Sequence, residues 1–398
     1  MHLNSLYIHN FRSLEDFEVK KLGQLNLIVG KNNSGKSAIL EALRIYAGNA
    51  NRALLKEIAE QHDEKHSPEQ DENDGFLPFE SFFSGRCFSD SLNSKSIVIG
   101  ASAEAVDALK LRHGYLIEKE ETIENSSGET TTRIRQQHLS KTEISGLFPL
   151  IDSNISQALR VEKNKSSYIL RLDESTRRRL SAPSLEDHKP IPCSYIPTQF
   201  VSQDELADEW DKIALSDLKE HTKIILNFIE DDFEDIAFVK NENAEEYRNY
   251  PGTRRALRRY AKIKMRNIQP VPLNSMGDGM FRVLQLSLKL FPAKGGFLLV
   301  DEFENGLHFS IQEKIWKWLF DLAEQLQIQV FATTHSWDCV ESFINVTLNK
   351  DNLNPKGVEG VLFRVGRSVR TSDKGKVIAT EFDKEKLSSI KQMYLEVR

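Results

Sequence analysis

The sequence predicts an α/β protein with a mixed central sheet, an antiparallel β section and a helical subdomain. Three observations lead to this fold class. Apolar runs typical of buried strands occur at residues 25–29, within 294–302 and within 329–336. Short segments of alternating polarity lie between residues 96 and 136, and a helical period runs from 203 to 229. Fully apolar strands are typical of a parallel sheet that is covered on both faces, whereas alternation is typical of antiparallel strands.

The composition limits the class of protein. The chain has 398 residues, of which 39% are hydrophobic and 28% are charged, as in a soluble globular protein of one to three domains. Its net charge of −6 requires any nucleic-acid contact to come from a local basic patch. Neither a signal peptide nor an apolar run of membrane-spanning length is present, so we expect a cytoplasmic protein without membrane contact. The distant Cys87, Cys193 and Cys339 indicate reduced thiols without zinc-ligand spacing.

The first part of the chain predicts a phosphate-binding loop. Candidate strands at residues 6–13 and 17–20 lead into the strand 25–29, and a helix is expected over 38–43. Residues 30–37 between them fit G-x-x-x-x-G-K-[ST] at every fixed position. We expect backbone N–H groups of the loop to surround a phosphate, together with the helix N-terminus. The residues of this cradle are Gly30, Asn32, Asn33, Ser34 and Gly35.

Two side chains of this loop have specific expected roles. Lys36 would reach the β- and γ-phosphates, and the hydroxyl of Ser37 would ligate Mg²⁺. A chance match in a glycine-rich loop is the alternative, but the flanking strand and helix argue against it. The sequence therefore predicts that the chain binds a nucleoside triphosphate.

The next segment predicts a solvated acidic loop. Residues 61–75 carry six acidic side chains and one lysine, with Pro68 and Gly75 among them. His62, Asp63 and His66 could be interpreted as metal ligands. Their spacing without a fold around it disfavours that interpretation.

The middle of the chain predicts antiparallel strands followed by helix. Strands are expected at 97–99, 115–122, 130–135 and 167–172, with a hairpin turn at 125–128. In the helical segment 203–229 the expected core positions are Leu206, Trp210, Ile213, Leu218, Ile224, Ile225 and Phe228. A further strand is expected at 236–239.

Residues 254–266 form the one concentrated basic stretch, with seven basic side chains and no acid. Arg254, Arg255, Arg258 and Arg259 would share a helical face, and Lys262, Lys264 and Arg266 alternate as on a strand. Such a patch could bind a phosphate backbone or an acidic protein. A merely solvated face remains the alternative, because one tyrosine, Tyr260, does not make the repeated aromatic interleaving of single-strand binders.

Two later strands end in polar residues that suit phosphate chemistry. The run before Asp301 and Glu302 is fully apolar, and ligands bind at the carboxyl ends of such strands. Asp301 would hold the Mg²⁺ shell through water, and Glu302 would act as the general base for an attacking water. The third strand, within 329–336, leads to His335.

These motifs and their order resemble the ABC-type ATPases of the SMC, RecF and OLD (overcoming lysogenisation defect) superfamily. Ser275, Gly277 and Asp278 match its signature, Ser-x-Gly-Asp/Glu at a helix start, which closes over ATP bound by the opposite subunit. The resemblance implies that His335 is the switch histidine at the γ-phosphate and that Arg12, in Asn-Phe-Arg-Ser, lies near the phosphates.

The remaining family positions are less uniform. Residues 304–308 occupy the position of the D-loop. Transporters and SMC proteins usually carry Asp at the position of His308, whereas OLD-like members often have His there. Gln199 is the best candidate for the metal-contacting Q-loop glutamine. The resemblance covers residues 1–50 and roughly 190–345. It implies a nucleotide-binding lobe over 1–200, a helical insert with the signature over 201–285, and a second lobe over 286–398.

The resemblance implies an ATPase head that binds ATP and Mg²⁺ and pairs as a homodimer or higher oligomer. An OLD-like regulatory ATPase in anti-phage defence, as in the PARIS system, would act with a separate effector such as a TOPRIM-type nuclease. The 63 residues after His335 lack the Glu and Asp-x-Asp set of such a nuclease. A RecF-like DNA-repair ATPase is the alternative, with DNA bound through residues 254–266. A transporter subunit is disfavoured because 239 residues separate Lys36 from Ser275.

Overall fold

The computed structural model describes residues 2–64, 79–88, 96–124, 130–140, 143–144, 155–172, 185, 189–241, 258–348, 358–373, 375–382 and 384–393. Three sheets are formed by these residues. The central sheet has six strands in the order β16-β15-β3-β14-β13-β9. Five of them are parallel and β16 is antiparallel to β15, so the predicted mixed central sheet is confirmed.

The strands of the central sheet come from distant parts of the chain. Their bounds are β3 (Leu25–Val29), β9 (Cys193–Ile196), β13 (Phe297–Val300), β14 (Gln329–Thr334), β15 (Gly360–Arg367) and β16 (Val377–Phe382). The strands β3, β13 and β14 are buried at every residue, as their apolar runs predict. Their side chains alternate between two cores: Leu298 and Val300 face one, and Phe297 and Leu299 face the other. The sheet is therefore the layer that separates the two cores.

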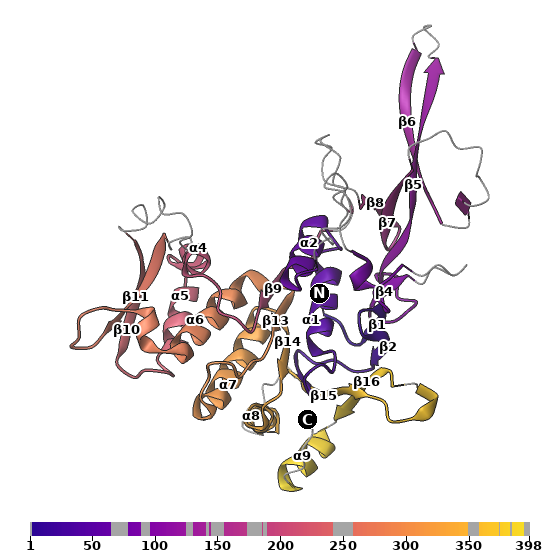
Figure 1. The fold of residues 1–398 in the computed structure, drawn as a ribbon. Helices are drawn as coiled ribbons and strands as arrows, with labels where there is room; N and C mark the ends of the chain where they lie inside the picture. The colour runs from indigo at the N-terminus through magenta and orange to yellow at the C-terminus, as the bar shows by residue number, and fades with distance from the viewer. Residues whose placement is uncertain are drawn as a thin grey trace.

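One face of the central sheet is covered by helices. They are α6 (Asp278–Leu290), α7 (Phe309–Gln325) and α8 (Trp337–Leu348), with α9 (Lys384–Met393) packed on α8 (Figure 1). The helices α4 (Gln203–Ile213) and α5 (Leu218–Leu226) pack against α6 and the small sheet described below (Figure 1). Helix α6 is buried along nearly its whole length and includes the fully buried Arg282. None of the helices in the described ranges is long and apolar enough to cross a membrane.

The other face is covered by α1 (Lys36–Ala47), α2 (Arg52–Gln61) and the second sheet. That sheet is antiparallel in the order β2-β1-β4-β5-β7-β8, with β6 paired to β5, which confirms the antiparallel section. Its strands are β1 (Leu6–Phe11), β2 (Leu14–Val19), β4 (Ile97–Gly100), β5 (Leu109–Glu124), β6 (Thr130–Leu139), β7 (Ile155–Lys163) and β8 (Ser166–Arg171). Beyond Ile117, β5 pairs with β6 alone, and this ribbon extends away from the body (Figure 1). The hairpin turn expected at 125–128 lies outside the described residues.

A third, small sheet joins β10 (Phe233–Lys240), β11 (Arg259–Met265) and β12 (Val271–Pro272). The prediction of a helical face for Arg258 and Arg259 is wrong, since β11 begins at Arg259. Ala261, Ile263 and Met265 are buried in alternation, and this two-residue period sets the strand. Arg254 and Arg255 lie outside the described residues.

The helical segment 203–229 is two helices, which break between Ile213 and Leu218. Leu206, Trp210, Ile213 and Ile225 are buried as predicted, and Leu218 and Phe228 pack partly buried against the same core. The prediction for Ile224 is wrong, because its side chain is 51% exposed. Adjacent residues of a helix point about 100° apart, so only one of Ile224 and Ile225 can face this core.

Candidate active site

The predicted site residues meet at the carboxyl ends of neighbouring parallel strands. The phosphate loop (residues 30–37) follows β3, Asp301 and Glu302 follow β13, and His335 follows β14. These three strands are adjacent in the order β3-β14-β13. Parallel strands deliver their carboxyl ends to one edge, where ligands bind in such sheets. The sheet therefore brings together groups that are far apart in the chain.

The phosphate loop needs its two glycines for different reasons. A Cβ atom on Gly30 would lie 2.4 Å from the backbone oxygen of Val365, which leaves no room for any side chain. Gly35 has a φ of 103°, which strongly favours glycine. It also precedes α1, whose N-terminus has no side-chain cap. The backbone N–H groups of the first helical turn are thus offered to an anion at this end of α1.

The lysine of the loop is buried and bound to the loop itself. Lys36 Nζ donates hydrogen bonds to the carbonyl oxygens of Gly30 at 2.7 Å and Lys31 at 3.0 Å. Burial lowers the pKa of Lys36, and the carboxylates of Asp301 and Glu302 oppose that shift. The hydroxyl of Ser34 is buried nearby without a hydrogen-bond partner among the described residues. Both groups suit a phosphate oxygen, because such an acceptor would satisfy the Ser34 hydroxyl and pair with the Lys36 charge.

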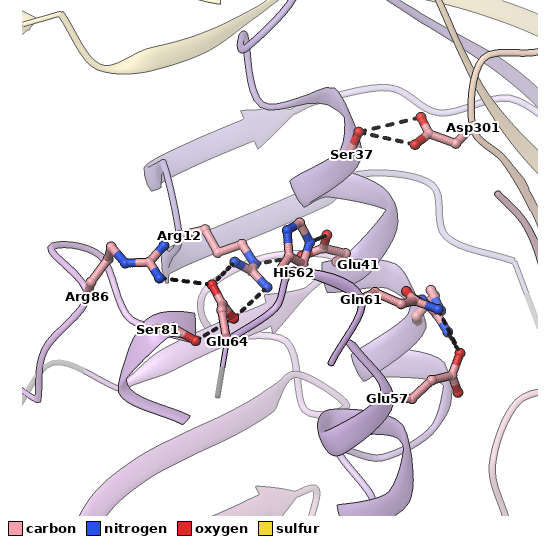
Figure 2. A network of polar contacts seen from close by, with 11 residues as sticks. Arg12, Ser37, Glu41, Glu57, Gln61, His62, Glu64, Ser81, Arg86 and Asp301 are labelled. Carbon is pink, nitrogen blue, oxygen red and sulfur yellow. Dashed lines mark hydrogen bonds and ion pairs between the residues drawn. The ribbon is translucent and has the colours of Figure 1, made fainter. Parts of the chain in front are cut away.

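Ser37 and Asp301 form the pair that could hold a divalent cation. The Ser37 hydroxyl lies 3.2 Å from Asp301 Oδ2 and 3.5 Å from Oδ1, across the gap between α1 and the end of β13 (Figure 2). A hydroxyl and a carboxylate are the oxygen ligands that Mg²⁺ accepts alongside water and phosphates. The donor set therefore fits the predicted metal. Gln199 follows β9, the parallel neighbour of β13, and is exposed at the same edge of the sheet.

The predicted general base is held in an unusual backbone conformation. Glu302 has a φ of 47°, which is costly for a residue with a side chain. Two contacts hold it: its N–H donates to Thr333 Oγ1 at 2.8 Å, and its carbonyl accepts from the guanidinium of Arg282 at 2.9 Å. Thr333 Oγ1 also donates to Asp301 Oδ1 at 2.6 Å. Thr333 therefore links Asp301, the predicted metal ligand, to Glu302, the predicted general base.

Arg282, on helix α6 behind the signature, donates hydrogen bonds to the backbone at the end of β13. Its guanidinium also donates to the carbonyls of Asp301 at 2.7 Å and Pro197 at 2.8 Å. Burial lowers the pKa of Arg282 to about 10, and nearby carboxylates oppose that shift. Thr333 and Arg282 were missed in the sequence, since a buried threonine on an apolar strand and an arginine on a helix carry no motif.

His335 lies beside two carboxylates. Its Nδ1 is 3.1 Å from Glu304 Oε1 and 3.7 Å from Glu302 Oε1. The His335 backbone N–H also donates to Glu304 Oε1 at 3.1 Å. The structure thus brings His335 to the predicted base, as a switch histidine would be placed, and adds Glu304.

Arg12 is bound by acids and not by the phosphate loop. Its Nε is 2.6 Å from Glu41 Oε2, and its Nη1 is 2.9 Å from Glu64 Oε1 (Figure 2). Glu64 also accepts from Ser81 and Arg86. Burial by itself raises the pKa of Glu64, but the hydrogen bonds from Ser81 and Arg12 and the charges of Arg12 and Arg86 together lower it. Glu64 is 6% exposed, so the interpretation of 61–75 as a solvated loop is wrong at this residue. Residues 65–75 lie outside the described residues.

The metal interpretation of His62 has no support in the structure. His62 Nε2 lies 2.5 Å from Glu41 Oε1, and this hydrogen bond raises the pKa of His62. Within the described ranges, no group of three or more His, Cys, Asp or Glu residues could hold a metal ion. His66 lies outside them.

The signature residues are exposed at the N-terminus of α6. Ser275, Gly277 and Asp278 are all exposed, and Gly277 has a φ of 81° with no atom near the position of a Cβ. Gly306 of the D-loop lies against Asp278, since a Cβ atom on Gly306 would be 3.3 Å from that residue. His308 caps α7, accepting from the backbone N–H of Ser310. Capping of α7 is therefore a local structural role for the histidine in the D-loop.

Two basic side chains of the stretch, Arg259 and Lys264, lie against acids. Arg259 pairs with Asp211 through two contacts of 2.5 and 2.9 Å, and Lys264 Nζ lies 2.9 Å from Glu234. The backbone N–H groups of Arg258 and Arg259 donate to Asp204. The small sheet is therefore a weaker candidate for nucleic-acid contact than its sequence predicts.

Comparison with protein families matches residues 1–340 to the AAA ATPase domain. The chain belongs to the AAA ATPase domain family. This match spans most of the chain and includes every residue of the site described above. The ATPase is thus an ATP-hydrolysing enzyme with the α/β fold and P-loop that the sequence predicts.

Two proteins are similar to this ATPase in sequence. An ATP/GTP phosphatase of Helicobacter pylori is 23% identical over 366 residues, which cover 88% of this chain and 89% of the relative. The uncharacterized protein MJECL10 of Methanocaldococcus jannaschii is 46% identical over 44 residues, covering 11% of this chain and 20% of that protein.

Solved structures similar to the ATPase include heads of SMC proteins. The SMC head domain from Thermotoga maritima has 13% identity and a TM-score of 0.41, covering 96% of this chain and 100% of that one. An SmcHead bound to the C-winged helix domain of ScpA has 14% identity and a TM-score of 0.48, covering 98% and 100%. Both TM-scores lie below 0.5.

Proposed function

We propose that this ATPase works as an ATP-dependent switch, in which two copies enclose two ATP molecules and bias the action of another protein. The observation that carries the proposal is the exposure of Ser275, Gly277 and Asp278 at the start of α6. A glycine with open space around it and an uncapped helix N-terminus suit the γ-phosphate of a nucleotide on another subunit. ATP would then act as the contact between the two copies.

The chemistry within each site follows from its own residues. The loop N–H groups and Lys36 bind the phosphates, while Ser37 and Asp301, with Gln199 beside them, would hold Mg²⁺. When bound, the ion would neutralise charge on the phosphates. Glu302 accepts a proton from water as the water oxygen attacks the γ-phosphorus and the bond to the β–γ bridging oxygen breaks. ADP and inorganic phosphate are the products. His335 would contact the γ-phosphate during this step.

The finer assignment is to the OLD-like branch, with a role in anti-phage defence. It is supported by His308 in the D-loop, whereas the Ser-x-Gly-Asp signature is common to the whole superfamily that the sequence resembles. The output would come from a separate effector such as a TOPRIM-type nuclease that binds the two states of the dimer differently. A DNA-repair role is less favoured, because Arg259 and Lys264 of the basic stretch already pair with acids.

The test is self-association that depends on ATP. We would measure the molar mass of the Glu302→Gln variant by analytical ultracentrifugation with ATP and Mg²⁺, and repeat it with Ser275→Arg added. The first should double its mass with ATP, and the second should bind ATP but stay at the lower mass. ATP turnover at the wild-type rate by Ser275→Arg, or by a strictly monomeric protein, would overturn the proposed sandwich.

A further inference from the structure

Glu304 is an acidic residue at the site that neither the phosphate loop nor the base at Glu302 requires. It follows Glu302 by two residues and begins the D-loop. We propose that Glu304 is a positioning residue, which orients the imidazole of His335 for ATP hydrolysis. This inference rests on the proposed role of His335 in the reaction.

The contacts of Glu304 fix both the backbone and the ring of His335. One oxygen, Oε1, accepts from the His335 backbone N–H at 3.1 Å and lies 3.1 Å from the ring Nδ1. The other nearby carboxylate, of Glu302, is 3.7 Å from Nδ1. Two contacts from a single atom restrain the peptide and the side-chain rotation together. Glu304 is therefore the acid that sets the direction of the ring.

A positioning residue should be more buried than the side chain it orients, and Glu304 and His335 differ in this way. The side chain of Glu304 is 11% exposed and that of His335 is 49% exposed. A buried anchor holds a ring whose opposite edge, with Nε2, is directed away from the anchor. The D-loop adds to the rigidity, since the carbonyl of Glu304 accepts from the N–H of Leu307 at 2.8 Å.

A contribution to folding stability does not by itself explain why a carboxylate stands at position 304. Its second oxygen, Oε2, is buried without a hydrogen-bond partner in the described part of the chain, and an unsatisfied buried acceptor costs free energy. The positive charges of Lys36 and Arg282 interact with it electrostatically. One oxygen of this acid is thus unsatisfied beside the proposed reacting centre, where the orientation of groups strongly affects the rate.

The first experiment compares variants of Glu304 in steady-state ATP hydrolysis by the full chain. Glu304→Ala removes both contacts and should lower kcat about tenfold, with a smaller change in KM for ATP. Glu304→Gln keeps an oxygen that can accept from the His335 backbone N–H and lie against Nδ1, and should retain at least about a third of wild-type kcat. Glu385→Ala, at an exposed position of α9, is the matched control and should behave as wild type.

A double-mutant comparison decides whether Glu304 acts through His335. In the His335→Ala background, Glu304→Ala should cause no further loss, because the group it positions is already absent. Multiplicative losses would overturn the proposal, as would wild-type kcat in Glu304→Ala. Wild-type turnover by His335→Ala would instead contradict the proposed role of His335, so the two failures are distinguishable.

A third variant keeps the test decisive if Glu304→Ala does not fold. Glu304→Asp retains the charge but shortens the side chain, so its oxygen withdraws from both nitrogens of His335. We expect Glu304→Asp to lose kcat and Glu304→Gln to keep it, with both folded by circular dichroism. An active Glu304→Asp beside an inactive Glu304→Gln would mean that charge matters and not position, and would overturn the inference.

Discussion

The edge of the central sheet and the small sheet β10-β11-β12 both collect charged residues, but they use them differently. At the edge, Lys36, Asp301 and Glu302 come from separate segments, and Lys36 donates its hydrogen bonds to backbone carbonyls of its own loop. In the small sheet, Arg259 and Lys264 each lie against an acidic side chain of the same region. The Lys36 charge has only backbone carbonyls as hydrogen-bond partners and the Ser34 hydroxyl has none in the described part of the chain, whereas Arg259 and Lys264 each have a carboxylate.

The comparison shows that a charged motif in the sequence indicates a ligand site only if its side chains are not already paired with other residues of the fold. The basic stretch, residues 254–266, is the more conspicuous of the two in sequence, because it holds seven cations and no acid. The pairs of Arg259 with Asp211 and of Lys264 with Glu234 cannot be read from the stretch itself, because both acids lie in earlier elements of the chain.

Removing the lysine of the phosphate loop should have the largest effect and mark the edge as the ligand-binding side. Lys36→Ala deletes the cation that pairs with the phosphates, so ATP binding and turnover should both become undetectable. The measurement is equilibrium binding of a fluorescent ATP analogue, with Lys391→Ala, at an exposed position of α9, as the control. If Lys36→Ala still bound ATP, the edge of the central sheet could not be distinguished from the small sheet as the ligand-binding region.

Thr333→Val tests whether the edge depends on buried polar contacts. Valine has nearly the same shape but cannot bond to the Glu302 N–H or to Asp301 Oδ1. We expect turnover to fall about 10-fold to 10²-fold through misplacement of the base. The variant should also lose about 1–3 kcal/mol in the free energy of unfolding. Chemical denaturation and ATPase assays measure the two effects, and an unchanged rate would show that Thr333 does not position the base.

Lys264→Ala tests whether the small sheet holds a nucleic-acid site. Each phosphate contact contributes about 0.9 to the slope of log affinity against log salt concentration. Because Lys264 pairs with Glu234, we expect any DNA affinity to keep its salt slope and ATP turnover to stay unchanged. A slope reduced by about 0.9 in fluorescence anisotropy titrations would contradict the compensated surface.

Arg259→Ala should have only a small effect on stability. Its ion pair with Asp211 is partly exposed, at 30% and 55% of the two side chains, so its loss should cost about 0.2–1 kcal/mol in the free energy of unfolding. Urea denaturation measures this. A loss of several kcal/mol would mean that the pair is a core element and not a solvated compensation.

The sequence predicts the centre of this molecule better than its surroundings. The strand, loop and helix of residues 25–47 and the acids after β13 are local patterns, and the fold places them as expected. Strand β7, the break between α4 and α5, and the choice of Ile225 over Ile224 depend on neighbours that are remote in the chain. The same holds for Arg12, whose partner Glu64 is 52 residues away.

The central claim is that the edge of the sheet hydrolyses ATP with Glu302 as the base. Pre-steady-state hydrolysis of ATP by Glu302→Gln, beside a measurement of ATP affinity, tests it most directly. Glutamine keeps the shape of the side chain but cannot accept the proton, so the rate should fall on the order of 10²–10⁴ while affinity is preserved. Hydrolysis at the wild-type rate by Glu302→Gln would contradict the account.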